Sequence, residues 1–444
     1  MNKKIIIICF FSLFFFLNPS YIYASEKENI TFILKDDFQG EKIYKDAKKI
    51  FSRDKVTYLK EVNILNINTN NNNGISYLKK QYKNEIIESA TLLKVKDTTN
   101  KVSDNVKLQN KKFQKNNWYL NRITNNGDSL RINNGDKNIK IGVIDSGVDQ
   151  DHPLLKKSVD YRNSKNYVIG ENNIDSMGHG TMVAGVINAI SPQTTIVSYK
   201  VMGKKDGESI WVIKAIIDAA NSKNQILNLS LGTYKSEEKE DEHTTIQAYK
   251  RAINYARSKG VLVVGAMGNE GYNLNEHYKN NNELELPASI NGVISVSSTM
   301  KNHQIAPYSN TGNMVSFSAP SGFFGNDYIK NRKVDITEMV VTTFPKGKEH
   351  NQFDRMANIP NGYTLSFGTS LSAPQVTASL ANLQSEYRKS MRKEPSNDEI
   401  VNYLAKGSVD LGPKGKDNKY GYGEINLYKS LKILIKDSKK ISIK

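Results

Sequence analysis

The chain has 444 residues, 38% of them hydrophobic and 24% charged, and its formal net charge at pH 7 is +17. This composition is that of a soluble globular protein long enough for about two or three domains. The positive charge is not accompanied by a nucleic-acid-binding motif, so nucleic acid is not an expected partner. Cys9 is the only cysteine, which excludes a disulfide scaffold.

Residues 1–24 have the pattern of a secretory signal peptide. Two lysines precede an apolar run over residues 5–17, and Ala24 provides a small residue at the end. A membrane anchor is the alternative, but the run is short for a spanning helix, which needs about 20 residues. No stable membrane insertion is therefore expected. Because Cys9 lies inside this segment, the mature chain has no thiol, and a nucleophile in it must be a hydroxyl.

Residues 25–96 alternate strand and helix patterns and predict a small α/β (ferredoxin-like) domain. Residues 97–117, rich in Lys, Asn and Asp, are predicted to be a linker with a processing site. A small module and a linker ahead of a larger domain suggest a pro-segment, and an unrelated accessory domain is the alternative. The expected strands are 30–34, 56–67 and 86–95, and the expected helices are 41–51 and 74–82.

Residues 118–430 alternate longer strand and helix patterns, which predicts a parallel sheet covered by helices on both faces. In such sheets the functional residues gather at the carboxyl ends of the strands. Residues 431–444 are predicted to be a basic C-terminal tail. The main expected strands are 140–144, 195–201, 225–229, 261–266 and 292–297, and the main expected helices are 180–190, 209–222, 244–259 and 370–387.

Three short segments carry residues suited to catalysis. Asp145 ends an apolar strand and is followed at once by Ser146 and Gly147, and His179 lies between two glycines at the start of a helix. Ser370 opens a long helix, where backbone N–H groups favour developing negative charge. Taken singly, each segment has an ordinary structural interpretation: a strand-ending turn, a capping histidine and an N-cap serine.

Taken together, the three segments resemble the motifs of the subtilisin-like serine proteases, in the order Asp, His, Ser. The resemblance extends over about residues 118–427 and includes the segments 228–232, 268–271 and 420–426. It implies a serine endopeptidase in which Ser370 is the nucleophile, His179 the general base and Asp145 its orienting carboxylate. Asn269 is implied to donate its amide to the oxyanion. The N-terminal module resembles the inhibitor-type pro-domain of this family.

The same resemblance places the substrate between two strand segments. Main-chain hydrogen bonds would hold an extended peptide there whatever its sequence. The implied substrate-binding residues are Gly207 on one side, Ser230, Leu231 and Gly232 on the other, and Ala266, Met267 and Gly268 in a wall of the first specificity pocket. Met267 stands where relatives often have alanine, which suggests a narrowed or reshaped pocket.

Two departures from the family concern calcium. Many members have a long calcium-binding loop after the histidine helix, whereas residues 188–195 here are short. Many also have an aspartate after the His-Pro pair, where this chain has Leu154. Because a hard cation needs several oxygen ligands, the strong calcium site is expected to be absent. No cofactor or metal is predicted to be required, although weaker calcium sites remain open.

Acidic residues near the predicted cleft suggest cleavage after a basic residue. They comprise the stretch 235–243 together with Asp206, Glu208 and Glu270; solvated loop charge is the alternative. The whole pattern is similar to that of the bacterial lantibiotic leader peptidases, which implies a secreted, monomeric zymogen acting on a precursor peptide and inhibited by its own pro-segment. The alternatives are a general extracellular subtilase, a catalytically silent relative, and a cationic protein that adheres to the cell envelope.

Overall fold

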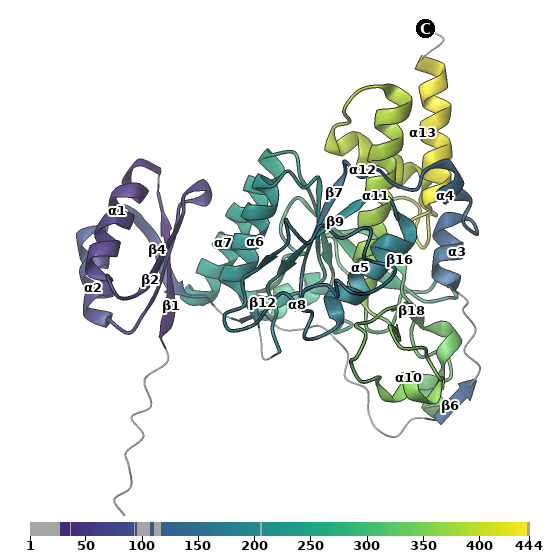
Figure 1. Ribbon diagram of the computed structural model, residues 1–444, viewed down its shortest axis with the longest axis horizontal. Coiled ribbons are helices and arrows are strands. Elements are labelled where there is room, and N and C mark those ends of the chain that lie inside the picture. Colours follow the sequence, from purple (N-terminus) through teal and green to yellow (C-terminus); the bar gives the residue numbers. More distant parts are fainter. Residues whose placement is uncertain are drawn as a thin grey trace, which may run out of the picture.

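The computed structural model describes residues 27–35, 37–92, 94–95, 107–110, 117–204 and 207–441. The predicted signal peptide and most of the predicted linker lie outside these residues. A small N-terminal α/β unit lies beside a larger α/β domain, against the helices that cover one face of its sheet (Figure 1).

The N-terminal unit is a four-stranded antiparallel sheet with two helices. Its strands are β1 (Glu28–Leu34), β2 (Lys55–Leu59), β3 (Ile64–Thr69) and β4 (Ile86–Thr91), arranged β2-β3-β1-β4, and its helices are α1 (Asp37–Ile50) and α2 (Asn72–Gln81). This order is that of the ferredoxin-like βαββαβ motif. Residues 56–67 were predicted to be one strand, but a 3-10 turn at Lys60–Val62 and a left-handed Asn63 (φ 53°) reverse the chain between β2 and β3.

The larger domain is built on a seven-stranded parallel sheet, as the sequence predicts. Its order is β16-β15-β13-β11-β7-β9-β8. The strands are β7 (Lys140–Asp145), β8 (Lys165–Asn166), β9 (Thr195–Lys200), β11 (Ile226–Leu229), β13 (Leu262–Ala266), β15 (Val293–Thr299) and β16 (Val315–Pro320). Most side chains of these strands are fully buried because helices cover both faces.

Two hydrophobic cores lie on the two faces of this sheet. Helices α5 (His179–Ile190) and α11 (Thr369–Met391) pack on one face, together with α3 (Trp118–Thr124) and α12 (Asn397–Gly407). Helices α6 (Ser209–Asn221) and α7 (Glu240–Ser258) pack on the other, between the sheet and the N-terminal unit (Figure 1). No helix in the described part of the chain is long and apolar enough to cross a membrane.

Small two-stranded sheets form separately from the seven-stranded sheet. They pair β5 (Lys94–Val95) with β10 (Gly207–Glu208), β6 (Lys107–Asn110) with β17 (Lys333–Asp335), β12 (Thr233–Ser236) with β14 (Glu283–Leu286), and β18 (Val340–Thr343) with β19 (Tyr363–Ser366). Because β6 lies inside residues 97–117, that segment is not a linker throughout.

Two further sequence predictions are corrected. The boundary at residue 430 falls inside α13 (Leu427–Ile441), whose Leu431 and Leu434 are fully buried against α11 and α12, so residues 431–441 are part of the domain and not a tail. The acidic stretch 235–243 is only partly a loop. It comprises the end of β12, the connection 237–239 and the first turn of α7, where Glu240, Asp241 and Glu242 lie near the positive end of the helix dipole.

Candidate active site

Asp145 and His179 meet at the carboxyl edge of the central sheet. Asp145 is the last residue of β7 and His179 the first of α5, and both side chains are buried. His179 Nδ1 lies 2.8 Å from Asp145 Oδ1, which also accepts a hydrogen bond of 2.7 Å from the Ser146 backbone N–H. A carboxylate at Nδ1 favours the tautomer that carries its proton there and its lone pair on Nε2, the form required of a general base.

A buried carboxylate beneath this pair holds the start of α5. Asp175 Oδ1 accepts from Ser146 Oγ (2.8 Å) and the Gly178 N–H (2.7 Å), and Oδ2 accepts from the Thr181 N–H (2.9 Å) and Oγ1 (2.6 Å). Burial raises the pKa of Asp175, although these hydrogen bonds act in the opposite direction. Asp175 therefore ties the residue after Asp145 to the helix start that carries His179.

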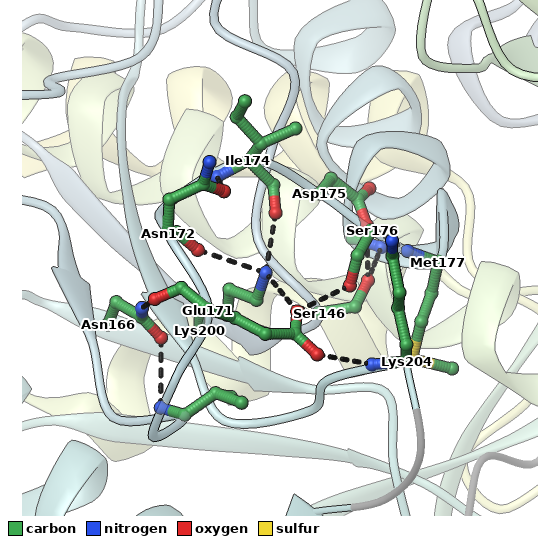
Figure 2. A network of polar contacts seen from close by, with 12 residues as sticks. Ser146, Asn166, Glu171, Asn172, Ile174, Asp175, Ser176, Met177, Lys200 and Lys204 are labelled. Atoms are coloured by element: carbon green, nitrogen blue, oxygen red, sulfur yellow. Dashed lines mark hydrogen bonds and ion pairs between the residues drawn. The ribbon is translucent and has the colours of Figure 1, made fainter.

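A buried ammonium fixes the loop that supplies Asp175 (Figure 2). Lys200, only 1% exposed, donates from Nζ to the carbonyl oxygens of Asn172 (3.1 Å) and Ile174 (2.5 Å) and pairs with Glu171 Oε2 at 2.9 Å. Burial acts to raise the pKa of Glu171, but hydrogen bonds from the Lys204 N–H, Lys200 and Ser176 lower it to about 2. The sequence analysis did not single out Lys200 or Glu171.

Ser370 lies in the first turn of α11 and is buried, with a small exposed fraction of 4%. Its backbone carbonyl accepts a hydrogen bond of 2.8 Å from Ser230 Oγ, which in turn accepts one of 2.9 Å from Asn228 Nδ2. Thr377 Oγ1, farther along α11, donates to Asn228 Oδ1 at 2.9 Å. These bonds connect the predicted substrate segment at Ser230 to the turn that carries the predicted nucleophile.

Asn269 lies beside Ser370 in an orientation suited to an oxyanion hole. Its Oδ1 accepts hydrogen bonds from the Thr369 N–H and from Thr369 Oγ1, both at 2.9 Å. The opposite end of the side-chain amide is therefore Nδ2, the hydrogen-bond donor. A Cβ placed on Gly368 would lie 3.3 Å from Ser370 Oγ and 3.5 Å from Asn269 Nδ2. Both groups therefore border the same space, and Gly368, with φ +137°, allows the close backbone approach.

A buried glutamate that the sequence analysis missed packs against Gly232, one of the predicted substrate-binding residues. Glu285, 2% exposed, packs so closely on Gly232 that a Cβ on Gly232 would lie 2.0 Å from Glu285 Oε1. Its Oε2 accepts a hydrogen bond of 3.1 Å from the Ala288 N–H. Burial, together with the negative charge of Glu270, raises the pKa of Glu285 well above its ordinary value.

The predicted residues of the first specificity pocket, Ala266, Met267 and Gly268, occupy the end of β13 and the turn after it. Ala266 ends β13 and Gly268 adopts a positive φ of 95° beside Glu270. Met267 is fully buried in a small apolar cluster with Leu274, Ala288 and Val315, a packing role that the sequence did not predict. Glu270 accepts from Tyr234 Oη at 2.6 Å and from Asn310 Nδ2 at 2.9 Å, so its charge is held beside this turn.

Gly207 was predicted to lie on the substrate strand opposite Ser230. In the structure its strand, β10, pairs with another segment of the same chain. Strand β10 forms an antiparallel ladder with β5, with Gly207 opposite Val95 and Glu208 opposite Lys94. Asp206 lies outside the described residues. The segment that follows the N-terminal unit thus uses the strand edge that the sequence analysis assigned to substrate.

Polar contacts also connect the N-terminal unit to α7. Arg251 Nη1 donates to the carbonyl oxygens of Leu34 and Val62, each at 2.9 Å. His243 Nδ1 lies 3.0 Å from Glu88 Oε1. Part of the acidic stretch 235–243 belongs to this region, because His243 is its last residue. Glu237 and Glu238, in the same stretch, instead contact Tyr278 and Asn282.

The two segments that bind calcium in many relatives are poorly suited to it here. The connection between α5 and β9 is only the four residues Ser191–Thr194, and Ser191 Oγ is hydrogen-bonded to Thr194 and Asn382. Leu154 is half exposed and offers no side-chain oxygen. This donor set does not fit the strong calcium site of the family.

A parallel α/β domain in which an aspartate, a histidine and a serine come from β7, α5 and α11 has the architecture of a subtilisin-like serine endopeptidase. The family model for the Peptidase S8 subtilase family matches residues 136–423, and the chain belongs to that family.

Similar proteins include enzymes that process leader peptides. The epidermin leader peptide-processing serine protease EpiP of Staphylococcus epidermidis is 28% identical over 481 residues, covering 97% of this chain and 100% of the relative. A crystal structure of a lanthipeptide protease is 42% identical with a TM-score of 0.69, covering 71% of this chain and 94% of the other. That of EpiP from Staphylococcus aureus is 27% identical with a TM-score of 0.72, covering 92% and 99%.

Proposed function

We propose that this serine endopeptidase is secreted and removes the leader from a lantibiotic precursor by cleaving after a basic residue. The relatives named for leader processing support the substrate class. The observation that carries the specificity is the buried carboxyl of Glu285 against Gly232, one of the predicted substrate-binding residues. Similarity along nearly the whole chain of EpiP favours this function over general protein degradation.

In the proposed mechanism Ser370 Oγ attacks the carbonyl carbon before the scissile bond while His179 Nε2 accepts the hydroxyl proton. Asp145, bonded to Nδ1, stabilises the imidazolium that results. Asn269 Nδ2 and the Ser370 N–H donate to the oxyanion of the tetrahedral intermediate. His179 then protonates the leaving amine, the C–N bond breaks, and a water deprotonated by His179 hydrolyses the acyl-enzyme.

The preference for a basic residue follows from charge in a confined pocket. A buried carboxylate is unfavourable unless a cation accompanies it, and Glu285 has a second negative charge, Glu270, near enough to raise its pKa further. A lysine or arginine side chain entering between Gly232 and Gly268 would supply that cation and favour the ionised form of Glu285. Acidic substrates would add a third negative charge.

The N-terminal unit is proposed to act as an intramolecular inhibitor. Its connection runs along β10, where the substrate backbone is expected, and Arg251 binds two of its carbonyl oxygens. The mature enzyme is further proposed to be a monomer that needs no calcium, with loose attachment to the anionic cell envelope through its positive charge. Expression of Ser370→Ala in a host without other proteases should yield the unprocessed proform.

Cleavage of a peptide library by the mature enzyme tests the proposal, with Ser370→Ala as the inactive control and Glu285→Gln as the pocket variant. We expect dominant cleavage after Arg or Lys, and loss of that preference in Glu285→Gln. Cleavage at many sites after large apolar residues would support a general subtilase instead. Cleavage after Glu or Asp would contradict the basic specificity and would point to Lys235, a buried lysine on β12.

A further inference from the structure

Helix α13 carries a row of lysines on the side that faces away from the domain. Its residues Leu427, Leu431 and Leu434 are fully buried against α11 and α12. Because successive residues of a helix are rotated by about 100°, the five lysines of α13 fall within an arc of about 100° opposite these leucines. All five are exposed and together form the lysine stripe: Lys429, Lys432, Lys436, Lys439 and Lys440.

The protein itself does not neutralise the lysine stripe. Lys440 lies 3.8 Å from Asp437, and within the described residues the other four lysines form no ion pair. The basic residues at and just after the end of α11 do have acidic partners: Arg388 pairs with Glu394, Lys389 with Glu386 and Lys393 with Glu399. Since lysines three and four positions apart on a helix repel one another, the stripe keeps a positive charge that an anionic partner would compensate.

The lysine stripe lies far from the catalytic residues. Tyr387, near the end of α11, contacts Tyr403 of α12 with ring centroids 6.2 Å apart. Burial raises the pKa of Tyr403, and the nearby charge of Asp437 acts in the same direction, so the second half of α13 lies beside this end of α11. Tyr387 is about 25 Å along the helix from Ser370. Figure 1 also shows α13 on the side of the larger domain away from the N-terminal unit, so a partner on the stripe would leave the cleft open.

The shape of the stripe indicates the kind of partner. Interfacial helices bind a bilayer by burying their apolar face in it, but the apolar face of α13 is already buried in the domain. From Lys429 to Lys440 the stripe is about 16 Å long and narrow, which suits one linear chain of anions. We propose that the lysine stripe binds a linear phosphodiester polymer of the cell envelope through its ammonium groups. This deepens the envelope attachment of the proposed function and rests on it only for the extracellular location.

The test measures binding of the Ser370→Ala protein to poly(glycerol phosphate) by calorimetric titration at low ionic strength. The stripe variant replaces Lys429, Lys432 and Lys436 by glutamine, which has a helix propensity similar to that of lysine. Because a lysine next to an anionic surface contributes about fivefold in affinity, the stripe variant should bind at least about tenfold more weakly than its parent. An unchanged affinity would overturn the proposal.

A control variant with the same net charge separates the stripe from overall charge. It replaces three exposed lysines elsewhere by glutamine: Lys156, Lys157 and Lys279 of α8 (Leu274–Asn281). This control should lose less than about threefold in affinity, and a loss equal to that of the stripe variant would overturn the proposal. The slope of log affinity against log salt should fall by about two in the stripe variant only, since each contact to a flexible phosphate chain contributes about 0.7. If the stripe variant does not fold, the single change Lys432→Glu decides, and unchanged binding in it would refute the stripe.

Vesicles of phosphatidylglycerol offer the same phosphodiester anion from a lipid source. Stripe-dependent binding to the polymer supports the proposal, whereas stripe-dependent binding to vesicles with none to the polymer would overturn it and identify a membrane surface instead. In the active protein the stripe variant should cleave a soluble peptide at the parent's rate, because the stripe is remote from Ser370. The binding measurements use an inactive protein, so their failure leaves the cleavage specificity untouched, and the peptide library in turn does not test the stripe.

Discussion

Replacement of Lys200 by methionine tests whether the buried ammonium organises the loop before His179. Methionine keeps much of the apolar stem but removes three bonds, to Glu171 Oε2 and to the carbonyl oxygens of Asn172 and Ile174. Breaking a buried ion pair costs about 3–5 kcal/mol because it leaves a charge without compensation. Since the Glu171 side chain keeps 22% exposure and other donors, we expect the lower end, about 3 kcal/mol.

The assay is urea unfolding at pH 7 in the Ser370→Ala background, which prevents self-digestion. Lys165→Met is the matched control, because Lys165 pairs with Asp218 at 3.1 Å while 45% exposed, and such surface pairs contribute about 0–1 kcal/mol. In the active protein, Lys200→Met should lower kcat more than it raises KM, because Asp175 would no longer be held beneath Asp145 and His179.

The pH dependence of stability provides a second test of the ion pair between Lys200 and Glu171. The lowered pKa of Glu171, about 2, means that its stabilisation is present above the ordinary value of 4.5 and is lost as pH falls toward 2. Lys200→Met should therefore lose less stability than the wild type over that interval. A stability loss at pH 7 no larger than that of Lys165→Met would refute the role assigned to Lys200.

Three further predictions concern the site. Asn269→Ala should lower kcat about 10²–10³-fold with little change in KM, a range that comes from a subtilisin and not from this structure; a loss under tenfold would remove Asn269 from the oxyanion hole. Because the pKa of Glu285 is raised above 4.5, its contribution to stability is present below that pH and is lost as pH rises. Glu285→Gln in the Ser370→Ala background should thus gain melting temperature relative to the parent between pH 5 and pH 8, and a constant difference would contradict the assigned burial. Activity should persist in a calcium chelator, and a clear loss would show that a required calcium site exists.

Several features could be predicted because their signals are local in the chain. Asp145 ends an apolar strand and Ser370 begins a helix, so the backbone around each residue determines where its side chain points. Helical spacing also predicted α5 and the start of α11 to within one residue, although α11 continues four residues beyond the predicted end at residue 387. The C-terminal helix carried such a signal at Leu427, Leu431 and Leu434, but the surrounding lysines led to the interpretation as a tail.

The sequence by itself determined the family, the three predicted catalytic residues and the parallel sheet that brings two of them to one edge. Only the tertiary structure decided the environment of the buried charges. In residues 283–286 glutamate and leucine alternate, which predicts glutamates on a solvent face; pairing of β14 with β12 instead buries Glu285 against Gly232. Lys200 finds its partners 26–29 residues earlier in the chain. The pattern of a single segment carries no information on such pairings, because burial is set by whichever distant segment packs against it.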